Sequence, residues 1–288
     1  MKIGGAVMNM YEKKGYLDTE FKFFHLIDTA LREFNYHYHE FDKIIIFLSG
    51  NVNYMIEGKS YMLEPRDILL VNRNDIHKPK INFSLPYERI VIYISPIFME
   101  KYHTDFYDLA TCFHLAKKEH SNVIRIHPAK RQKLLNLIDN LKKALNETAF
   151  ASDLSAKLLF LEFMIHLNRA ILDHQIEAIS TTVYDKKIIE ILQYINANLF
   201  ETIHADNLSQ KFFISKYHMM RKFKEETGYS IHQYITNKRL LCSRDLIQQD
   251  IPITKVCFDC GFKDYSTFSR AFKTIFKTTP REYKKSRQ

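Results

Sequence analysis

GFKDYSTFSRAFKTIFKTTPREY, residues 261–283, is the stretch that decides the fold of the C-terminal part of this chain. The glycine ends one short predicted helix, and a second helix is predicted to begin at Asp264. Phe268 and Phe272 lie four residues apart and therefore share one face of that helix, whereas polar residues occupy the other face. This pattern is typical of a helix that packs on one side and contacts DNA with the other.

The same layout occurs 49 residues earlier in the chain. Five residues match at this fixed offset: Ser215, Arg221, Phe223, Lys224 and Tyr234 match Asp264, Arg270, Phe272, Lys273 and Tyr283. Two similar helical units in tandem predict a domain that contacts DNA twice.

The charge distribution agrees with a DNA partner. The formal net charge is +9, and residues 181–288 carry +8 of it. A basic excess confined to the repeats favours a phosphate-rich partner, and a basic tail that serves solubility is the alternative.

The 288 residues fit two domains, and a hydrophobic content of 46% excludes a disordered chain. We expect no secretory or membrane-spanning segment, no membrane partner and a cytoplasmic location.

The cysteines predict neither a disulfide framework nor a zinc site. Cys257 and Cys260 form a CxxC pair, but no second pair in the sequence has the spacing of zinc ligands. Both are predicted to lie on the short helix before Gly261, where a small apolar residue packs against a neighbouring helix. We therefore expect no metal or redox role for this pair.

The chain divides into a β part and a helical part. Residues 20–115 are predicted to be β, because short runs rich in Ile, Val, Phe and Tyr alternate with turn signals. Strands at this spacing predict a small barrel or sandwich. Residues 173–184 are a predicted linker, and Asp185 is expected to cap the helix that follows.

The predicted fold class is α+β. An N-terminal domain, residues 1–175, is expected to hold a small cupin-like β-barrel plus helices, and to bind an effector and form a dimer. A C-terminal domain, residues 185–288, is expected to be all-α with two helix-turn-helix units.

Residues 129–146 and 153–172 in the middle of the chain are two predicted helices, and the second is apolar on more than one side. Leu134 and Leu141 belong to an apolar stripe of the first helix, and Leu158 belongs to a stripe of the second, as does Leu161. A helix of this kind buries two faces. One face can pack on the barrel and the other on a second copy of the chain, which predicts a homodimer. Packing of both faces within one monomer is the alternative.

The C-terminal part resembles the AraC/XylS family of transcription regulators over residues 185–285. The first unit reads NLSQKFFISKYHMMRKFKEETGYSIHQYI, and the second, ITKVCFDCGFKDYSTFSRAFKTIFKTTPREY, is similar to the family signature almost throughout. Phe213 stands where the family often has a glycine, which leaves the geometry of the first turn open. The joining helix NKRLLCSRDLI matches the arginine-led linker helix of the family.

The resemblance implies that the outward residues of both recognition helices contact double-stranded DNA. They are Lys216, Tyr217, Met220 and Arg221 in the first unit, and Lys263, Tyr265, Ser266, Ser269 and Arg270 in the second. Arginine can pair bidentately with guanine, whereas methionine and tyrosine pack on a thymine methyl group or a sugar. For Lys222, Lys224 and Lys273 we expect phosphate contact or plain solvation.

The N-terminal part resembles the cupin-like sensor barrel of many such regulators, on NYHYHEFDKIIIFLSG at 35–50 and GKSYMLEPRDILLVNRNDIHKP at 58–79. On an extended strand His37, His39 and Lys43 share one face. Metal-binding cupins have the motif H-x-H-x-x-x-E and a later histidine, and here Lys43 stands in the place of the glutamate. An ammonium group repels a cation and offers no lone pair, so we expect no metal and no other cofactor.

The expected alternative to a metal is a small-molecule pocket in the barrel mouth, lined by His37, His39, Lys43 and His77. Lys43 suits a polar or anionic ligand, and the resemblance makes a sugar one candidate. Histidines with a purely structural role are the simpler interpretation.

The leading functional prediction is a transcription regulator that binds DNA, responds to a small-molecule effector and has RNA polymerase as a further partner. A metal-dependent cupin enzyme fused to a DNA-binding module is the alternative from another class. A third hypothesis is a regulator that responds to a protein partner. No nucleotide loop, serine–histidine–acid set or carboxylate pair indicates catalysis, so we expect no catalytic residues.

Overall fold

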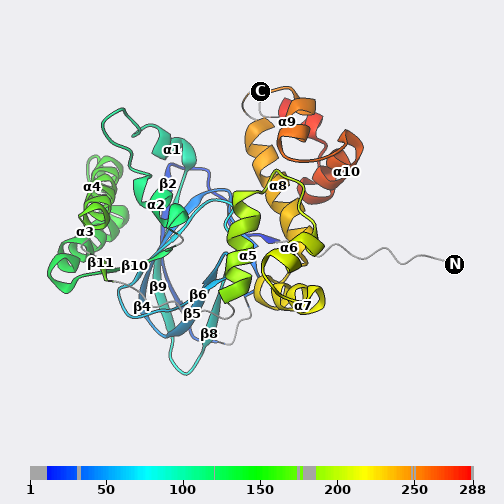
Figure 1. Cartoon of the computed structure of the whole chain (residues 1–288). Helices are drawn as coiled ribbons and strands as arrows, with labels where there is room; N and C mark the ends of the chain where they lie inside the picture. The colour runs from blue at the N-terminus through cyan, green and yellow to red at the C-terminus, as the bar shows by residue number, and fades with distance from the viewer. Residues whose placement is uncertain are drawn as a thin grey trace. The chain divides into compact units, whose positions relative to one another are not determined.

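The computed structural model describes residues 12–30, 34–119, 121–173, 176–177, 186–247, 249 and 251–286. The chain forms two compact units. One lies within residues 13–182, apart from the turn at 57–59, and the other consists mainly of residues 183–288, to which Glu12 and the turn at 57–59 are assigned. The N-terminal unit consists of strands and helices and the C-terminal unit of helices, which confirms the α+β class (Figure 1). Asp185 and its predicted cap lie outside the described residues.

Two antiparallel sheets build the described part of the N-terminal unit. The six-stranded sheet has the order β11-β10-β7-β4-β9-β2, with β2 at Phe21–Asp28, β4 at Asp42–Ser49, β7 at Ile68–Val71, β9 at Tyr87–Ile94, β10 at Val123–Ile126 and β11 at Ile176–Glu177. The five-stranded sheet has the order β1-β3-β8-β5-β6, with β1 at Glu12–Lys13, β3 at His37–Tyr38, β5 at Asn51–Ile56, β6 at Lys59–Met62 and β8 at His77–Asn82. The short strand β11 falls within the predicted linker, so residues 176–177 extend the sheet instead.

The six-stranded sheet is covered on both faces, and β4 shows how its residues divide. Ile44 and Ile46 belong to the core that the sheet shares with helices, whereas Ile45 and Phe47 belong to the core between the two sheets. The helices are α1 at Pro96–Glu100, α2 at Thr111–Lys118, α3 at Pro128–Asn146 and α4 at Ser152–Leu172. Successive side chains of a strand point to opposite faces, so Lys43 points to the same side as Ile45, between the sheets.

The prediction of β structure up to residue 115 is wrong after residue 95. Pro96 occupies the first turn of α1, where its missing N–H costs no hydrogen bond. Phe98 and Met99 of α1 are buried, and so are Cys112 and Phe113 of α2. These residues cover the side of the sheet that faces the helices. The short apolar runs in this segment therefore belong to helices, whereas the sequence pattern predicts strands.

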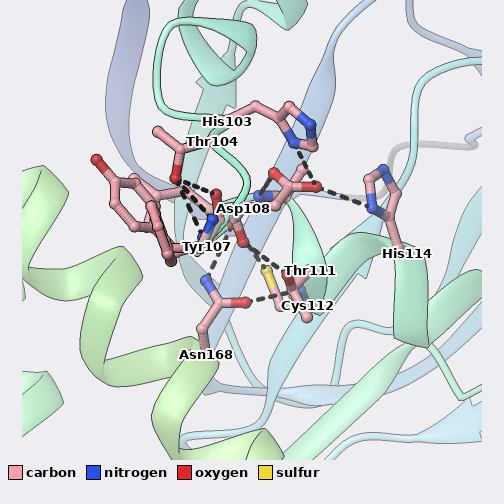
Figure 2. A network of polar contacts seen from close by, with 11 residues as sticks. His103, Thr104, Tyr107, Asp108, Thr111, Cys112, His114 and Asn168 are labelled. Atoms are coloured by element: carbon pink, nitrogen blue, oxygen red, sulfur yellow. Dashed lines mark hydrogen bonds and ion pairs between the residues drawn. The ribbon is translucent and has the colours of Figure 1, made fainter.

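A polar network holds the start of α2 against α4 (Figure 2). The amide of the buried Asn168 accepts a hydrogen bond from the backbone N–H of Cys112 at 2.7 Å and donates to the carbonyl oxygens of Leu109 and Met164 at 2.9 Å. The Asp108 carboxylate accepts from the N–H of Ala110 at 2.8 Å. The side-chain oxygen and nitrogen of Asn168 therefore both have hydrogen-bond partners within the N-terminal unit.

The middle helices differ in how far they are buried. Leu134 and Leu141 of α3 are buried in the core with the sheet, so the apolar stripe of this helix packs within the N-terminal unit. On α4, Leu154 and Leu158 are 53% and 58% exposed, whereas Leu161 is half-buried. Most of the exposed leucines of these two helices therefore lie on α4. None of the helices in the described ranges is long and apolar enough to span a membrane.

Seven helices are described in the C-terminal unit: α5 at Lys186–Ala197, α6 at Ala205–Lys211, α7 at Lys216–Thr227, α8 at Ile231–Ile247, α9 at Ile253–Asp259, α10 at Tyr265–Phe276 and α11 at Pro280–Lys285. The side chain of Ser215 accepts from the N–H of His218 and caps α7, and that of Asp264 accepts from Thr267 and caps α10. Phe223 of α7 and Phe272 of α10 are fully buried. Helices α6–α7 and α9–α10 are the two predicted helix-turn-helix units.

The two turns inside these units differ in length by one residue. Helices α7 and α10 repeat at an offset of 49 residues, but α6 and α9 repeat at 48, because the second turn holds one more residue. Phe213 and Gly261 each follow the capping residue of the preceding helix, and both have positive φ, +49° and +77°. Phe213 can occupy this position because its side chain points into solvent at 88% exposure.

We predict opposite effects of substitutions in the two turns. Phe213→Gly should raise the free energy of unfolding by about 0.5–1 kcal/mol, since glycine removes the cost of a left-handed backbone and loses little packing. Gly261→Ala should lower it by about 2–4 kcal/mol, because the new Cβ would lie 2.5 Å from the carbonyl oxygen of Phe200. Urea unfolding of both variants measures this. A Phe213→Gly variant less stable than the parent would show that the phenyl ring stabilises the turn.

Candidate effector and DNA-binding sites

The structure brings the four predicted effector residues together between the sheets. His37 of β3 pairs in register with His77 of β8, and their ring centroids lie 4.4 Å apart. His39 Nε2 lies 3.1 Å from His77 Nε2 and 3.1 Å from Lys43 Nζ. All four side chains are buried. The site is thus built from β3, the segment after it, β4 and β8.

The tautomer of each histidine is set by the backbone. The Nδ1 atoms lie in hydrogen-bond distance of carbonyl oxygens: that of Asn35 for His37 at 2.9 Å, that of Asp75 for His77 at 2.9 Å, and that of Lys14 for His39. A carbonyl oxygen only accepts, so Nδ1 must be the protonated nitrogen. In the neutral ring Nε2 then keeps its lone pair and acts as an acceptor.

Burial favours the neutral rings. Burial, with the nearby Lys43 ammonium as the second cause, lowers the pKa of His37 to about 3 and that of His39 to about 2. The pKa of His77 is also lowered, first by burial and then by His37 and Lys43. Loss of water on burial is therefore the largest cause for all three rings, and the Lys43 ammonium acts in the same direction.

Lys43 is the cationic side chain at the centre of the site. Burial, with the positive charges of Arg89 and Lys14, lowers its pKa to about 7. Within the described part of the chain no carboxylate pairs with its Nζ, which donates to His39 Nε2 and lies 5.8 Å from the ring centroid of Tyr93. Arg89 carries its own partner, Asp28, at 2.8 Å. The site therefore presents one donor, Lys43, beside three imidazole acceptors.

On the first recognition helix, α7, the structure exposes all four predicted DNA contacts. Lys216, Tyr217, Met220 and Arg221 lie on its surface. Two of them already have protein partners: Lys216 Nζ pairs with Asp206 of α6 at 2.8 Å, and Arg221 Nε lies 3.9 Å from the Glu225 carboxylate. Such exposed pairs are weak, so both side chains remain available to another anion.

On the second recognition helix, α10, the predicted residues are not equally accessible. Ser266 and Arg270 of α10 are exposed, as is Lys263 in the turn before this helix, whereas Tyr265 and Ser269 are half-buried. Tyr265 packs against the core around Phe268, with the ring centroids 6.0 Å apart. Thr267 and Thr274 are also exposed on this helix, and the sequence did not single them out. Their small polar side chains carried no pattern that set them apart from solvated residues.

Within the C-terminal unit, the two helix-turn-helix units are joined through one guanidinium group. Arg239 of α8 donates from Nε to the carbonyl of Leu199 at 2.7 Å, and from its two terminal nitrogens to those of Gly261 at 2.7 Å and Glu201 at 2.6 Å. Five fixed donors make arginine suited to such a set of acceptors. This residue belongs to the arginine-led helix that the sequence indicated, and it ties the segment before α6 to the turn before α10.

The CxxC pair lies in the core of the C-terminal unit. Cys257 and Cys260 are fully buried beside Phe268 and Phe272. Burial raises the pKa of Cys257, and it raises that of Cys260 to about 12. These thiols stay protonated at neutral pH and act as small apolar side chains.

Both units match known families of domains. Residues 24–164 match the model described as an AraC-like ligand binding domain, and residues 208–286 match the model described as a helix-turn-helix domain. The chain belongs to the AraC family of transcription regulators. The first match includes all four residues of the barrel site, and the second includes both recognition helices.

Similar proteins are regulators by name. An uncharacterized HTH-type transcriptional regulator of Staphylococcus aureus (strain COL) is 23% identical over 241 residues, which are 82% of this chain and 31% of the relative. This chain thus spans about a third of the length of that relative. The HTH-type transcriptional activator RhaS of Escherichia coli O139:H28 (strain E24377A / ETEC) is 22% identical over 260 residues, 88% of this chain and 89% of RhaS.

A solved AraC-type structure is similar to part of the chain. It is a transcriptional regulator from Chromobacterium violaceum, 29% identical, with a TM-score of 0.33 over 35% of this chain and 91% of that one.

Proposed function

We propose that this AraC-family chain regulates transcription in response to a small polar or anionic molecule bound between the sheets of the N-terminal unit. The observation that supports it is the buried Lys43, whose Nζ contacts an imidazole and no carboxylate in the described residues. A buried cation without a counter-ion is costly, and an anionic or hydroxyl-rich ligand would offset that cost. The domain division at 175 and 185 and a cytoplasmic location are part of this proposal.

The donors and acceptors narrow the ligand class. Lys43 donates, and each histidine offers a lone pair at Nε2, so a molecule with both hydroxyl and carboxylate groups satisfies them together. The phenol-bearing residues Tyr54 and Tyr93 lie on the same side, with Tyr54 at 6.0 Å from the His77 ring. Sugars and sugar acids have this chemistry. We propose them as the first ligands to examine, with RNA polymerase as the partner through which a bound regulator acts.

A thermal-shift screen of sugars and carboxylic acids against the full chain tests the effector proposal. A ligand at a hundredfold its dissociation constant stabilises the protein by about 2.7 kcal/mol. Lys43→Ala should remove that shift and the response of a reporter gene, because it removes the donor, and should leave operator binding without effector intact. Lys80→Ala, an exposed lysine on β8, is the matched control. Effector responses that persist in Lys43→Ala and in His39→Ala would place the ligand elsewhere.

For the C-terminal unit we propose that each recognition helix reads one major-groove segment of an operator. Arg221 of α7 and Arg270 of α10 occupy matching exposed positions, and the fixed repeat presents them in the same orientation on each helix. Exposed Lys273 lies at the following turn of α10, where a phosphate contact is expected.

Substitution of the arginines should therefore differ from substitution of the lysine. Arg221→Ala and Arg270→Ala should each cost about 1–3 kcal/mol of operator binding and relax preference at one base pair, since a bidentate guanine contact is lost. Lys273→Ala should weaken all sequences alike and lower the salt slope by about one unit. Binding to operators with single-base changes measures both. Equal losses on every operator for the arginines would assign them to phosphates.

We also propose a homodimer through α4. The exposed apolar residues Leu154, Leu158 and Ile165 follow one another at spacings of four and seven residues, which places them on one stripe of the helix. An isologous pairing of two such stripes would bury them.

Leu158→Glu should give a folded monomer, because a charge in an apolar contact is not compensated. Operator affinity should fall by about 100-fold, since the two subunits would no longer bind as one. Leu85→Glu is the control, a leucine of similar exposure, 56% against 58%, in the turn between β8 and β9. Analytical ultracentrifugation decides, and an unaltered chain that is monomeric with and without DNA would rule the dimer out.

Catalysis is not part of this proposal. The family consists of regulators, and the buried site holds histidines beside an amine, without a carboxylate from the described residues to act as acid or base with them.

A further inference from the structure

The three histidines between the sheets share one arrangement of their ring nitrogens. Each Nδ1–H donates to a backbone carbonyl oxygen, and the three carbonyls come from separate places in the chain, at Lys14, Asn35 and Asp75. Each ring is therefore held in orientation, and each neutral ring directs its lone pair through Nε2. Metal-binding histidines in proteins are oriented in this way, by a hydrogen bond from the nitrogen that does not bind the metal.

The lone pairs point at one another. His39 Nε2 and His77 Nε2 are 3.1 Å apart, although neither carries the proton that a hydrogen bond between them requires. One nitrogen from each of His37, His39 and His77 lies within 4.8 Å of the others. Lys43 Nζ donates to one of these acceptors, His39 Nε2, whereas a metal ion bound among the three nitrogens would satisfy all of them.

We propose that His37, His39 and His77 bind one transition-metal ion through Nε2, with Zn²⁺ as the expected ion. Zinc binds imidazole nitrogen at about 2.0–2.1 Å, so two ligands of a tetrahedral ion are about 3.4 Å apart. The His39–His77 pair, at 3.1 Å, already has nearly this separation, and a pair at the widest separation of 4.8 Å has to close by about 1.4 Å. Imidazole also suits Cu²⁺ and Ni²⁺, whereas Mg²⁺ and Ca²⁺ prefer oxygen.

Lys43 competes with the ion and does not exclude it. Its Nζ reaches His39 Nε2 on a flexible four-carbon chain, whereas the histidines are fixed by the backbone. Movement of this side chain alone frees the third lone pair and opens the fourth corner of a tetrahedron. From the sequence we expected no metal, because Lys43 replaces a carboxylate ligand. The positions of the nitrogens support a site that needs no carboxylate. The inference holds whether or not the chain responds to a small effector.

The test is metal binding by the full chain after treatment with a chelator. We expect Zn²⁺ and Co²⁺ to bind with one equivalent per chain in calorimetry, and Co²⁺ to give the visible absorption of a tetrahedral nitrogen site. His39→Gln and His77→Gln should each weaken binding by about 100-fold or more, since loss of a ligand costs at least as much as loss of its orienting partner. Lys43→Gln should bind about tenfold more tightly, a gain that a misfolded protein cannot produce.

A surface pair of histidines supplies the control. His103 and His114 lie 3.5 Å and 3.2 Å from the Asp108 carboxylate and are largely exposed (Figure 2). The double variant His103→Gln/His114→Gln should bind the metal as the parent does. No saturable binding by the parent, loss of binding in this double variant alone, or weaker binding by Lys43→Gln would each overturn the proposal. Operator binding measured on the same samples reports separately on the regulatory function.

Discussion

Burial of both faces of the six-stranded sheet is the constraint on which the N-terminal unit depends. Helices α1–α4 cover one face and the five-stranded sheet covers the other, so every residue of β4 from Lys43 to Phe47 is buried. Most of these buried positions hold apolar residues. Lys43 is the charged exception. Because side chains alternate along the strand, Lys43 must point between the two sheets, where polar groups surround it. The chemistry of the site follows from this single position.

The buried histidines are subject to the same constraint, and hydrogen bonds to the backbone satisfy part of their polar atoms. A buried imidazole is stable only if its polar atoms are satisfied, and the backbone carbonyls near β1, β3 and β8 satisfy one nitrogen of each ring. The other nitrogens converge and leave an acceptor-rich space beside one amine. Such a space is suited to a ligand or an ion that brings positive charge or hydrogen-bond donors. It lies in the part of the chain that matches an AraC-like ligand binding domain.

In the C-terminal unit the corresponding constraint is the fixed relation of two similar helical units. Arg239 bonds three carbonyl oxygens from segments that precede α6 and α10, and the phenylalanines of α7 and α10 are buried behind their exposed faces. Two recognition helices can contact one DNA molecule in register only if their spacing is kept. The extra residue in the turn between α9 and α10, and Gly261 in the same turn, are local differences that leave this relation unchanged.

The sequence alone determined the class of this protein. Helical spacing, capping residues and the repeat predicted both helix-turn-helix units, because these are local properties of a few consecutive residues. Short alternating runs predicted the strands, and His37, His39, Lys43 and His77 were predicted to meet because strand geometry puts three of them on one face.

The tertiary structure decided what depends on distant neighbours. It turned residues 96–118 into helices that cover a sheet, buried Leu134 and Leu141 of α3, and left Leu158 of α4 exposed. It also set which nitrogen of each histidine is protonated, since the carbonyl of Lys14 reaches His39 across 25 positions of sequence. Burial and hydrogen-bond partners come from chain segments that no local pattern brings together, so the chemical state of the site was decided only by the folded chain.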